Sequence, residues 1–136
     1  MPPLTLHHYG FLTANTAVWL TENELLLGKP FAVFNSISII SQKVKITFLQ
    51  QTENSVLTEL VEPLEENALL RKMITKGITV YHTGYMAAKN DFENVLQSFE
   101  KKGAKALPVF HSEAFDNRRC VFLITKNLGM IEIIEG

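Results

Sequence analysis

Two histidines and two glutamates recur at matching positions in the two halves of this 136-residue chain. His8 begins the segment His-Tyr-Gly-Phe, and 74 residues later His82 begins the segment His-Thr-Gly-Tyr. Glu59 and Glu132 lie in similar segments of apolar residues and glutamate, at an offset of 73 residues. Each histidine precedes its glutamate by 51 or 50 residues. Several matches at nearly one offset indicate an internal repeat, and these four residues occupy its equivalent positions.

These four residues have the chemistry of a ligand set for a divalent transition metal. Side-chain alternation puts each of them in an otherwise apolar row of a predicted strand, where a carboxylate is costly to desolvate unless a positive charge meets it. If the halves pack about a pseudo-twofold axis, His8, Glu59, His82 and Glu132 converge. Imidazole and carboxylate accept Co, Zn, Ni, Mn or Fe, so the sequence leaves the metal's identity open. Such an ion can act as a Lewis acid on a carbonyl or enolate oxygen.

The other polar residues near this pattern are weaker candidates. His7 falls on the face of its strand opposite His8, and it does not match His82 in the repeat. Glu62 and Glu135 fall on the face opposite Glu59 and Glu132, where we expect them to meet solvent. Cys120 is more typical of a buried apolar residue than of a nucleophile. A lone strand histidine is more often structural, so the metal hypothesis depends on the four residues together.

The elements that must position these residues also repeat. We predict strands over 4–12 and 78–87, each followed by a helix, over 16–27 and 91–102, that ends at a glycine. Asn90 or Asp91 is suited to cap the second helix. Three further strands are predicted in each half, over 31–39, 43–50 and 55–62 and over 106–110, 119–125 and 130–134.

This order predicts an α+β fold in which two βαβββ modules, related by pseudo-twofold symmetry, form a curved mixed sheet around a metal site. Module one covers about residues 4–62, module two about 77–136, and a bridging loop with a short helix lies over about 63–76. A chain of this length is typical of one domain, so we expect residues 1–136 to form one.

Composition excludes several classes of function. Thirteen Lys and Arg residues against 14 Asp and Glu residues leave a net charge of −1, with no field to hold nucleic acid or an acidic membrane. No window approaches the ~18 apolar residues of a membrane span, and the N-terminus has no signal-peptide pattern. One cysteine forms no internal disulfide. We therefore expect a cytoplasmic protein without nucleic-acid or membrane partners.

The chain resembles the vicinal-oxygen-chelate (glyoxalase/bleomycin-resistance/dioxygenase) superfamily, and within it the methylmalonyl-CoA epimerases. Residues 59–64, Glu-Leu-Val-Glu-Pro-Leu, are similar to the epimerase segment E-L-L-x-P-L. Residues 77–82 resemble the strand that carries the second histidine of these enzymes. Residues 117–123 and 126–132 resemble the segments G-K-R-V-x-F-L and P-K-x-x-G-V-L-I-E-L. The similarity covers nearly the whole chain and is weakest between residues 13 and 50.

This resemblance implies proton abstraction next to the carbonyl of a small acyl thioester, with the metal stabilising the enolate. It implies His8, Glu59, His82 and Glu132 as metal ligands, and it makes Glu132 also the base. Lys45 lies near the place of a second, acidic base in some epimerases, so a catalytic role for Lys45 would replace that base. Arg118, Arg119 and Lys126 are candidate contacts for CoA phosphates. We also expect a homodimer.

Two other functions remain open at this point. Glyoxalase I also has a glutamate at the position of Glu59, so a lyase acting on a glutathione hemithioacetal fits the same ligand set. A non-catalytic small-molecule binding or resistance protein of the same fold is the second alternative. The complete ligand set disfavours such a binding protein, and an analysis of bound metal distinguishes it from an enzyme.

Overall fold

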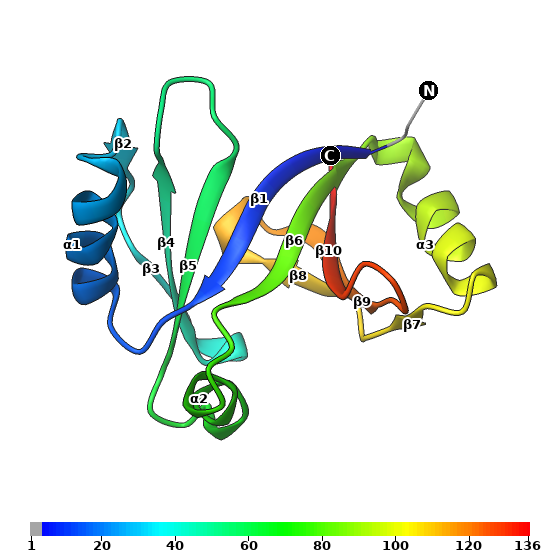
Figure 1. The fold of residues 1–136 in the computed structure, drawn as a ribbon. Helices are drawn as coiled ribbons and strands as arrows, with labels where there is room; N and C mark the ends of the chain where they lie inside the picture. The colour runs from blue at the N-terminus through cyan, green and yellow to red at the C-terminus, as the bar shows by residue number, and fades with distance from the viewer. Residues whose placement is uncertain (1–3) are drawn as a thin grey trace. The chain divides into compact units, whose positions relative to one another are not determined.

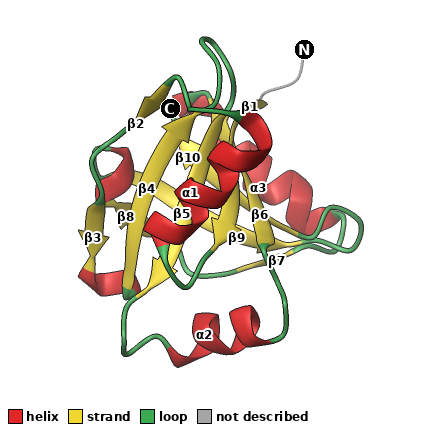
Figure 2. Cartoon of the chain, turned by 60° about the vertical axis from the view of Figure 1, so that its left-hand side comes forward, coloured by secondary structure: helices red, strands yellow, loops and turns green. Residues whose placement is uncertain are grey.

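The computed structural model describes residues 4–136, and it confirms the predicted α+β class with a mixed sheet of ten strands and three α-helices in those residues (Figures 1 and 2). The first half contains β1 (Leu4–Leu12), α1 (Thr16–Leu27), β2 (Ala32–Val33), β3 (Ile37–Ile39), β4 (Val44–Gln50) and β5 (Leu57–Pro63). The bridging segment forms α2 (Ala68–Thr75). The second half contains β6 (Val80–Ala87), α3 (Phe92–Lys101), β7 (Lys105–Ala106), β8 (Phe110–Ser112), β9 (Arg118–Ile124) and β10 (Met130–Glu135).

The chain forms two compact units, and strands β1 and β6 contribute residues to both. Unit 1 consists of the described residues up to His8 together with His82–Gly136, and unit 2 consists of Tyr9–Tyr81. No helix within residues 4–136 has the length and apolar character that crossing a membrane requires.

In unit 1 the sheet separates an apolar face from a face with polar residues. Its strand order is β1-β6-β10-β9-β7, in which β10 is parallel to β6 and antiparallel to β9, and β8 pairs with β9. One face is covered by α3 through a buried cluster formed by Ala87, Phe92, Val95, Leu96, Val121, Leu123, Ile131 and Ile133. Because side chains alternate along a strand, His82 and Glu132 lie on the opposite face.

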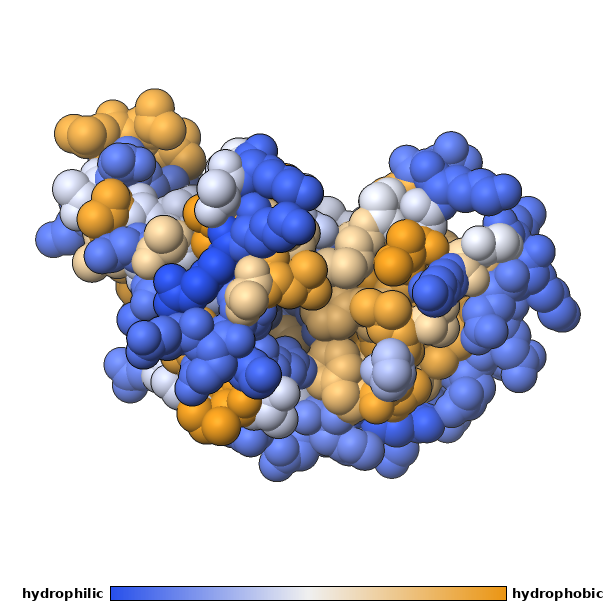
Figure 3. All heavy atoms as spheres, turned by 90° about the horizontal axis from the view of Figure 1, so that it is seen from below, coloured by the Kyte–Doolittle hydropathy of each residue, from blue (hydrophilic) through white to orange (hydrophobic). Residues whose placement is uncertain are grey.

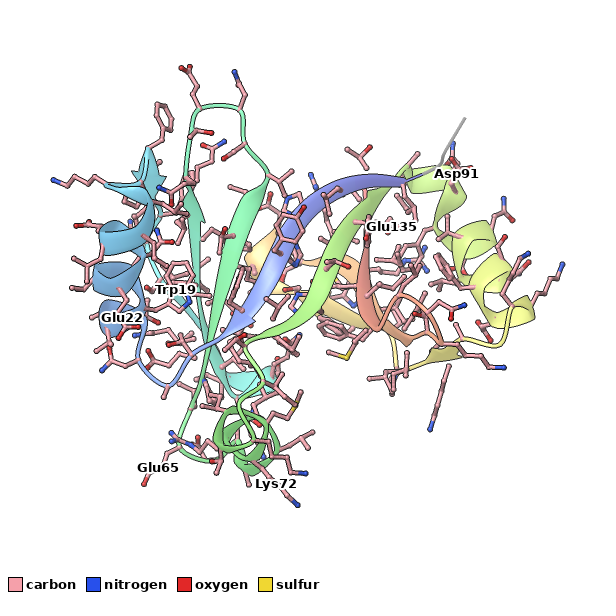
Figure 4. The ribbon with its side chains drawn as sticks, in the orientation of Figure 1. Trp19, Glu22, Glu65, Lys72, Asp91 and Glu135 are labelled. Atoms are coloured by element: carbon pink, nitrogen blue, oxygen red, sulfur yellow. The ribbon has the colours of Figure 1, made fainter. Side chains whose placement is uncertain are left out.

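Unit 2 has a comparable layer. Its strand order is β2-β4-β5-β1, with β3 beside β4, and the β4–β5 pair is antiparallel. Helix α1 contacts this sheet: Trp19 lies on the side of α1 nearest the strands in Figure 4, with its ring 5.6 Å from that of Phe11. The buried apolar residues of the unit include Leu12, Ile39, Val44, Ile46, Leu49, Leu60 and Val61, which lie on both faces of the sheet.

Two predicted strands are each divided into two short strands. The segment predicted over 31–39 forms β2 and β3, and the segment predicted over 106–110 forms β7 and β8, interrupted near Pro108. Proline has no N–H to donate to the ladder, which explains the second interruption. In both halves a 3-10 turn follows, Ile40–Gln42 or Glu113–Phe115, and then a residue with positive φ, Lys43 at 58° or Asp116 at 52°. The sequence repeat therefore extends to these turns.

Helices α1 and α2 begin with an asparagine cap, whereas α3 does not. Asn15 caps α1 by accepting a hydrogen bond from the backbone N–H of Val18, and Asn67 caps α2 in the same way from Leu70. Of the two caps predicted for α3, Asp91 is the N-cap residue, but its side chain makes no capping hydrogen bond. A 3-10 turn over Lys89–Asp91 leads directly into α3 instead.

Candidate metal centre

Three of the four predicted ligands meet within unit 1. His8 comes from β1, His82 from β6 and Glu132 from β10, which are consecutive strands of the unit 1 sheet. Because β6 and β10 pair in parallel with Glu132 opposite Gly84, Glu132 and His82 point from the same face. All three side chains are buried.

The donor atoms of these residues are close together. Nε2 of His8 lies 2.9 Å from Nε2 of His82 and 3.2 Å from Oε1 of Glu132. Nε2 of His82 lies 3.6 Å from the same carboxylate oxygen. Two imidazoles and one carboxylate thus direct three donor atoms to one point.

These separations fit a shared metal ion. Donor atoms bound to one ion through bonds of about 2.1 Å lie about 3.0 Å apart at right angles and about 3.4 Å apart at the tetrahedral angle. The observed distances of 2.9, 3.2 and 3.6 Å fall around these values. Two histidines and one carboxylate form a set that several transition metals accept with coordination positions left open.

The electrostatics of the centre favour an ionised Glu132. Burial alone raises the pKa of this carboxyl, but the adjacent imidazole groups of His8 and His82 outweigh burial and bring the pKa below its ordinary value. A negative carboxylate beside two imidazole nitrogens is the state in which all three groups can bind a cation.

Aromatic rings enclose the two histidines. The ring of Phe115 stacks on His8 with centroids 5.7 Å apart, and Phe122 meets His82 edge-on at 5.3 Å. Phe110 in turn stacks on Phe122 at 5.6 Å. Nothing in the sequence distinguishes these three residues, since aromatic side chains are usual core components.

Gly84 and His7 are two further residues of the centre that the sequence analysis did not assign. A Cβ atom at Gly84 would overlap the ring of His8, so only glycine leaves room for this imidazole. The repeated His-x-Gly segments were the available signal for Gly84. Nδ1 of His7 lies 2.9 Å from Nδ1 of His8. Burial, with His8 and Arg118 nearby, lowers the pKa of His7.

The fourth predicted ligand, Glu59, belongs to unit 2. It lies on β5, opposite Phe48 of β4, and it is buried. On its face of the sheet the neighbouring side chains of β4 and β5 are Ile46, Phe48 and Val61. Along β5 and across to β4, Glu59 therefore occupies an otherwise apolar row of side chains, as its alternation with Leu57 and Val61 predicts.

Lys45 lies on the other face of unit 2. It lies opposite Glu62 in the β4–β5 ladder, and its Nζ is 3.6 Å from Oε1 of Glu62. Glu62 is three residues after Glu59 on β5, so the two glutamates face opposite sides of the sheet. Glu62 also accepts hydrogen bonds from the backbone N–H and the hydroxyl of Thr16 at the start of α1. Lys45 thus faces the helix side of the sheet. This position does not support the catalytic role predicted for it.

The two arginines predicted to bind substrate lie on opposite faces of β9. Arg118 is exposed on the face of Glu132, with Nη1 3.9 Å from Sδ of Met86. Arg119 points to the α3 face, where its guanidinium contacts Glu135 at 2.6 Å and Glu93 at 2.7 Å and lies 4.7 Å from the centre of the Phe92 ring. These contacts occupy the Arg119 guanidinium, whereas Arg118 is exposed.

Glu62 and Glu135 are therefore not simple solvent-facing residues, and that expectation is wrong. Each accepts hydrogen bonds from groups on the helix-covered face of its unit, Thr16 for Glu62 and Arg119 for Glu135. Hydrogen bonds and nearby cations lower the pKa of both carboxyls. Figure 4 labels Glu135 on β10.

Lys126, the third predicted substrate contact, is exposed in the loop between β9 and β10. It borders a cavity of about 370 Å³ at the end of α3, which is lined by Ser98, Phe99, Lys102, Ala104, Thr125, Lys126, Asn127 and Leu128. Phe99 lies on the α3 side of the sheet, with the core cluster. Lys126 is thus set apart from the face that carries Glu132.

Comparison with known proteins gives structural neighbours only. No protein-family model matches the sequence, and no curated protein matches it. A hypothetical protein from Bacillus halodurans has a TM-score of 0.79 and 22% identity, covering 99% of this chain and 96% of its own.

Other neighbours are methylmalonyl-CoA epimerases. The enzyme from Mycobacterium tuberculosis has a TM-score of 0.75 and 18% identity, over 96% of this chain and 86% of its own. An epimerase solved in complex with methylmalonyl-CoA and NH4+ has a TM-score of 0.76 and 20% identity, over 99% of this chain and 96% of its own.

Proposed function

We propose that this chain, which has the vicinal-oxygen-chelate fold, is a metal-dependent enzyme that removes a proton next to the carbonyl of an acyl thioester. The observation that carries this proposal is the convergence of His8, His82 and Glu132 in unit 1, with donor atoms 2.9 to 3.6 Å apart. Methylmalonyl-CoA is the substrate that we propose to test first, because it is bound in a neighbouring structure.

We propose Glu59 as the fourth ligand. Its support is its position in the sequence repeat, equivalent to Glu132, and its burial in an apolar row of unit 2. Carboxylate oxygen is a ligand that divalent transition metals accept beside imidazole. Two carboxylates with two neutral imidazoles would balance the charge of a divalent ion.

Glu132 is the proposed base. A divalent ion held by these residues would supply Lewis-acid stabilisation of the negative charge that develops on the thioester oxygen. The lowered pKa of Glu132 favours its ionised form, and in the proposed step its carboxylate accepts the α-proton while the electrons of the C–H bond pass to the carbonyl. Return of the proton to the same carbon restores the thioester.

Inversion at the α-carbon additionally needs a proton from the opposite side. Lys45 is not proposed for this step, because it is paired with Glu62 on the other face of β4. The β4 residues on the face of Glu59, namely Val44, Ile46, Phe48 and Gln50, carry no titratable group. Glu59 is the remaining buried carboxylate of the proposed ligand set, and we propose it as the second proton carrier.

For the substrate carrier we propose one cationic contact. Arg118 is exposed on the face of Glu132, and a guanidinium pairs well with phosphate or carboxylate oxygens. We also propose Lys126 as a contact for a phosphate of the carrier, although its loop lies at the end of α3, apart from the face of Glu132. Arg119 is left out because Glu93 and Glu135 already bind it.

The test is exchange of the α-proton. The protein, loaded in turn with cobalt, zinc, nickel, manganese or iron(II), is incubated with methylmalonyl-CoA of one configuration in deuterated water. We expect deuterium at the α-carbon, and chiral analysis of the product reports inversion separately. Glu132→Gln should reduce the exchange rate about 100- to 10,000-fold. Glu135→Gln, three residues away on the other face of β10, is the matched control and should leave the rate unchanged.

Each other outcome has a defined meaning. Stoichiometric metal without exchange excludes the thioester substrate, and turnover of methylglyoxal with glutathione would then favour the glyoxalase I-like alternative. Less than a tenth of an equivalent of metal, unaffected by Glu132→Ala, would indicate the non-catalytic binding protein. Exchange without inversion would retain Glu132 as base and remove Glu59 as second proton carrier.

We also propose a homodimer in a reducing compartment such as the cytoplasm. Unit 2 exposes a group of large apolar side chains on α1 and beside β2, namely Val18, Leu25, Leu26, Leu27, Phe31, Val33 and Phe34. We refer to these seven residues as the α1 surface.

The single cysteine, Cys120, is buried and not disulfide-bonded, which agrees with a reducing environment.

A further inference from the structure

The ring of His8 contacts a different partner at each nitrogen. Nε2 faces the candidate metal centre, 2.9 Å from Nε2 of His82 and 3.2 Å from Oε1 of Glu132. Nδ1 faces away from the centre and lies 2.9 Å from Nδ1 of His7. The neighbouring histidine in the chain is thus within hydrogen-bond distance of the nitrogen of His8 that does not face the centre.

Two ring nitrogens at this distance must share one proton. A neutral imidazole has one N–H and one nitrogen with a lone pair, so exactly one of the two Nδ1 atoms is the donor in a hydrogen bond between neutral rings. If His8 donates, its Nε2 keeps the lone pair that a metal requires. If His7 donates, the Nε2 of His8 carries a proton and cannot bind a metal.

Packing restricts both rings to this contact. His8 is fully buried and stacks on Phe115, with an interplanar angle of 22°. The ring of His7 meets the same phenyl group edge-on, with centroids 5.5 Å apart and an angle of 80°. A hydrogen bond in such a low-dielectric environment is stronger than one in water.

We propose that His7 is a positioning residue that accepts the Nδ1–H of His8 and so keeps the lone pair of His8 on Nε2, toward the metal. This inference rests on the proposed function, because it concerns metal binding by His8. In this arrangement Nδ1 of His7 is the acceptor and its own proton is on Nε2. Hydrogen bonds of this kind to metal-binding histidines orient the ring and raise its basicity.

Three variants and the wild type test this proposal. His7→Phe keeps an aromatic ring beside Phe115 but removes the acceptor, whereas His7→Asn retains a side-chain oxygen that can accept from His8. His111→Phe is the matched control, since His111 is exposed on β8. Affinity for Co²⁺ is measured by competition with a chelator, and thermal unfolding of the metal-free proteins reports any loss of folding.

We expect His7→Phe to weaken Co²⁺ binding about 10- to 100-fold, the range found when such partners of metal-binding histidines are removed. His7→Asn should recover most of this affinity, and His111→Phe should bind as the wild type does. A folded His7→Phe protein with unchanged affinity would overturn the proposal without affecting the proposed function. Equal losses for His7→Phe and His7→Asn would also overturn it, because the acceptor would then not matter.

Nitrogen NMR of the metal-free protein gives an independent readout. Two-bond ¹H–¹⁵N correlations identify which ring nitrogen of His8 carries the proton. We expect the Nδ1–H form in the wild type and a substantial Nε2–H population in His7→Phe. A wild-type His8 in the Nε2–H form would contradict the proposal. If no metal binds to any form of the protein, the proposed function fails, and this NMR result still decides the hydrogen bond.

Discussion

Space for His8 is provided by one small residue. Gly84 follows His82 by two positions on β6 and lies opposite Glu132 on β10, so it is on the face that carries the candidate ligands. The His8 ring occupies the volume that any larger side chain at Gly84 would need. In the segment His82-Thr83-Gly84, the histidine is thus a candidate ligand and the glycine leaves room for the second candidate ligand, His8.

Gly84→Ala should disturb both stability and metal binding. The added methyl group overlaps the ring of His8, and overpacking of this kind costs about 1–3 kcal/mol of the free energy of unfolding. We expect denaturant unfolding to show this loss and Co²⁺ affinity to fall, because His8 must move. Thr83→Ala, at the preceding position with its side chain on the other face, should leave Co²⁺ affinity unchanged. Wild-type affinity in Gly84→Ala would show that His8 does not need its observed position.

At the scale of elements, each unit has an ion pair on the helix side of its sheet. Lys45 with Glu62 in unit 2 and Arg119 with Glu135 in unit 1 are equivalent pairs of the sequence repeat. The glutamate of each pair is three residues after a predicted ligand on the same strand, so it lies on the opposite face of the sheet. In unit 2 the pair also reaches the helix, because Glu62 accepts two hydrogen bonds from Thr16, the first residue of α1.

Glu62 is expected to stabilise α1 in a pH-dependent manner. Its hydrogen bonds with the backbone and hydroxyl of Thr16, together with Lys45, offset partial burial and lower the pKa of the carboxyl. A pKa lower in the folded than in the unfolded state gives a stabilisation present above the unfolded value of about 4.5 and lost as the pH falls through the folded value. Glu62→Gln should therefore reduce stability near pH 7 by roughly 0.5–1 kcal/mol, the lower part of the range for helix caps, since solvent screens this partly exposed group.

Chemical unfolding at a series of pH values measures this effect. The difference between wild type and Glu62→Gln should shrink as the pH falls below about 4.5. Lys45→Met, the control, should cost less than Glu62→Gln, because a half-exposed ion pair contributes little and the Thr16 hydrogen bonds remain. A difference that is constant with pH would show that ionisation of Glu62 is not the cause.

At the scale of the whole molecule, the α1 surface is a group of exposed apolar side chains in unit 2. Leu25 and Leu26 are each 83% exposed, and Phe31 is 58% exposed. Orange, apolar side chains reach the surface on the α1 side of Figure 3. Seven large side chains approach the roughly 800 Å² per partner that stable interfaces bury, which favours a second copy of the chain as the occupant.

Sedimentation velocity tests this proposed dimer. We expect the wild type to sediment at about twice the chain mass of 15.4 kDa. Leu26→Glu should shift it to the monomer, because burying an unpaired carboxylate opposes association. Leu69→Glu is the matched control: Leu69 is 71% exposed on α2, outside the α1 surface, and its replacement should leave the dimer intact. A monomeric wild type would contradict the proposal.

Much of the fold could be predicted from the chain alone, for reasons that particular residues make clear. The bounds of β1 and α1 agree with prediction, because alternation over His8 and Gly10 and the glycine stop at Gly28 are local signals. The strand predicted over 106–110 is instead divided into β7 and β8 on either side of Pro108. A proline within a strand pattern is the available signal there.

The sequence by itself determined which residues share a strand face and which are equivalent in the repeat, and so it indicated His8, His82 and Glu132. Both properties are local or periodic, and they are encoded by spacing alone. Tertiary structure decided what each side chain meets. Register sets Lys45 against Glu62, and α3 packing sets Arg119 against Glu93. The tilt of two adjacent rings over Phe115 brings His7 to His8. Contacts between strands and across layers depend on register, twist and packing, and the two-residue period of a single strand does not carry that information.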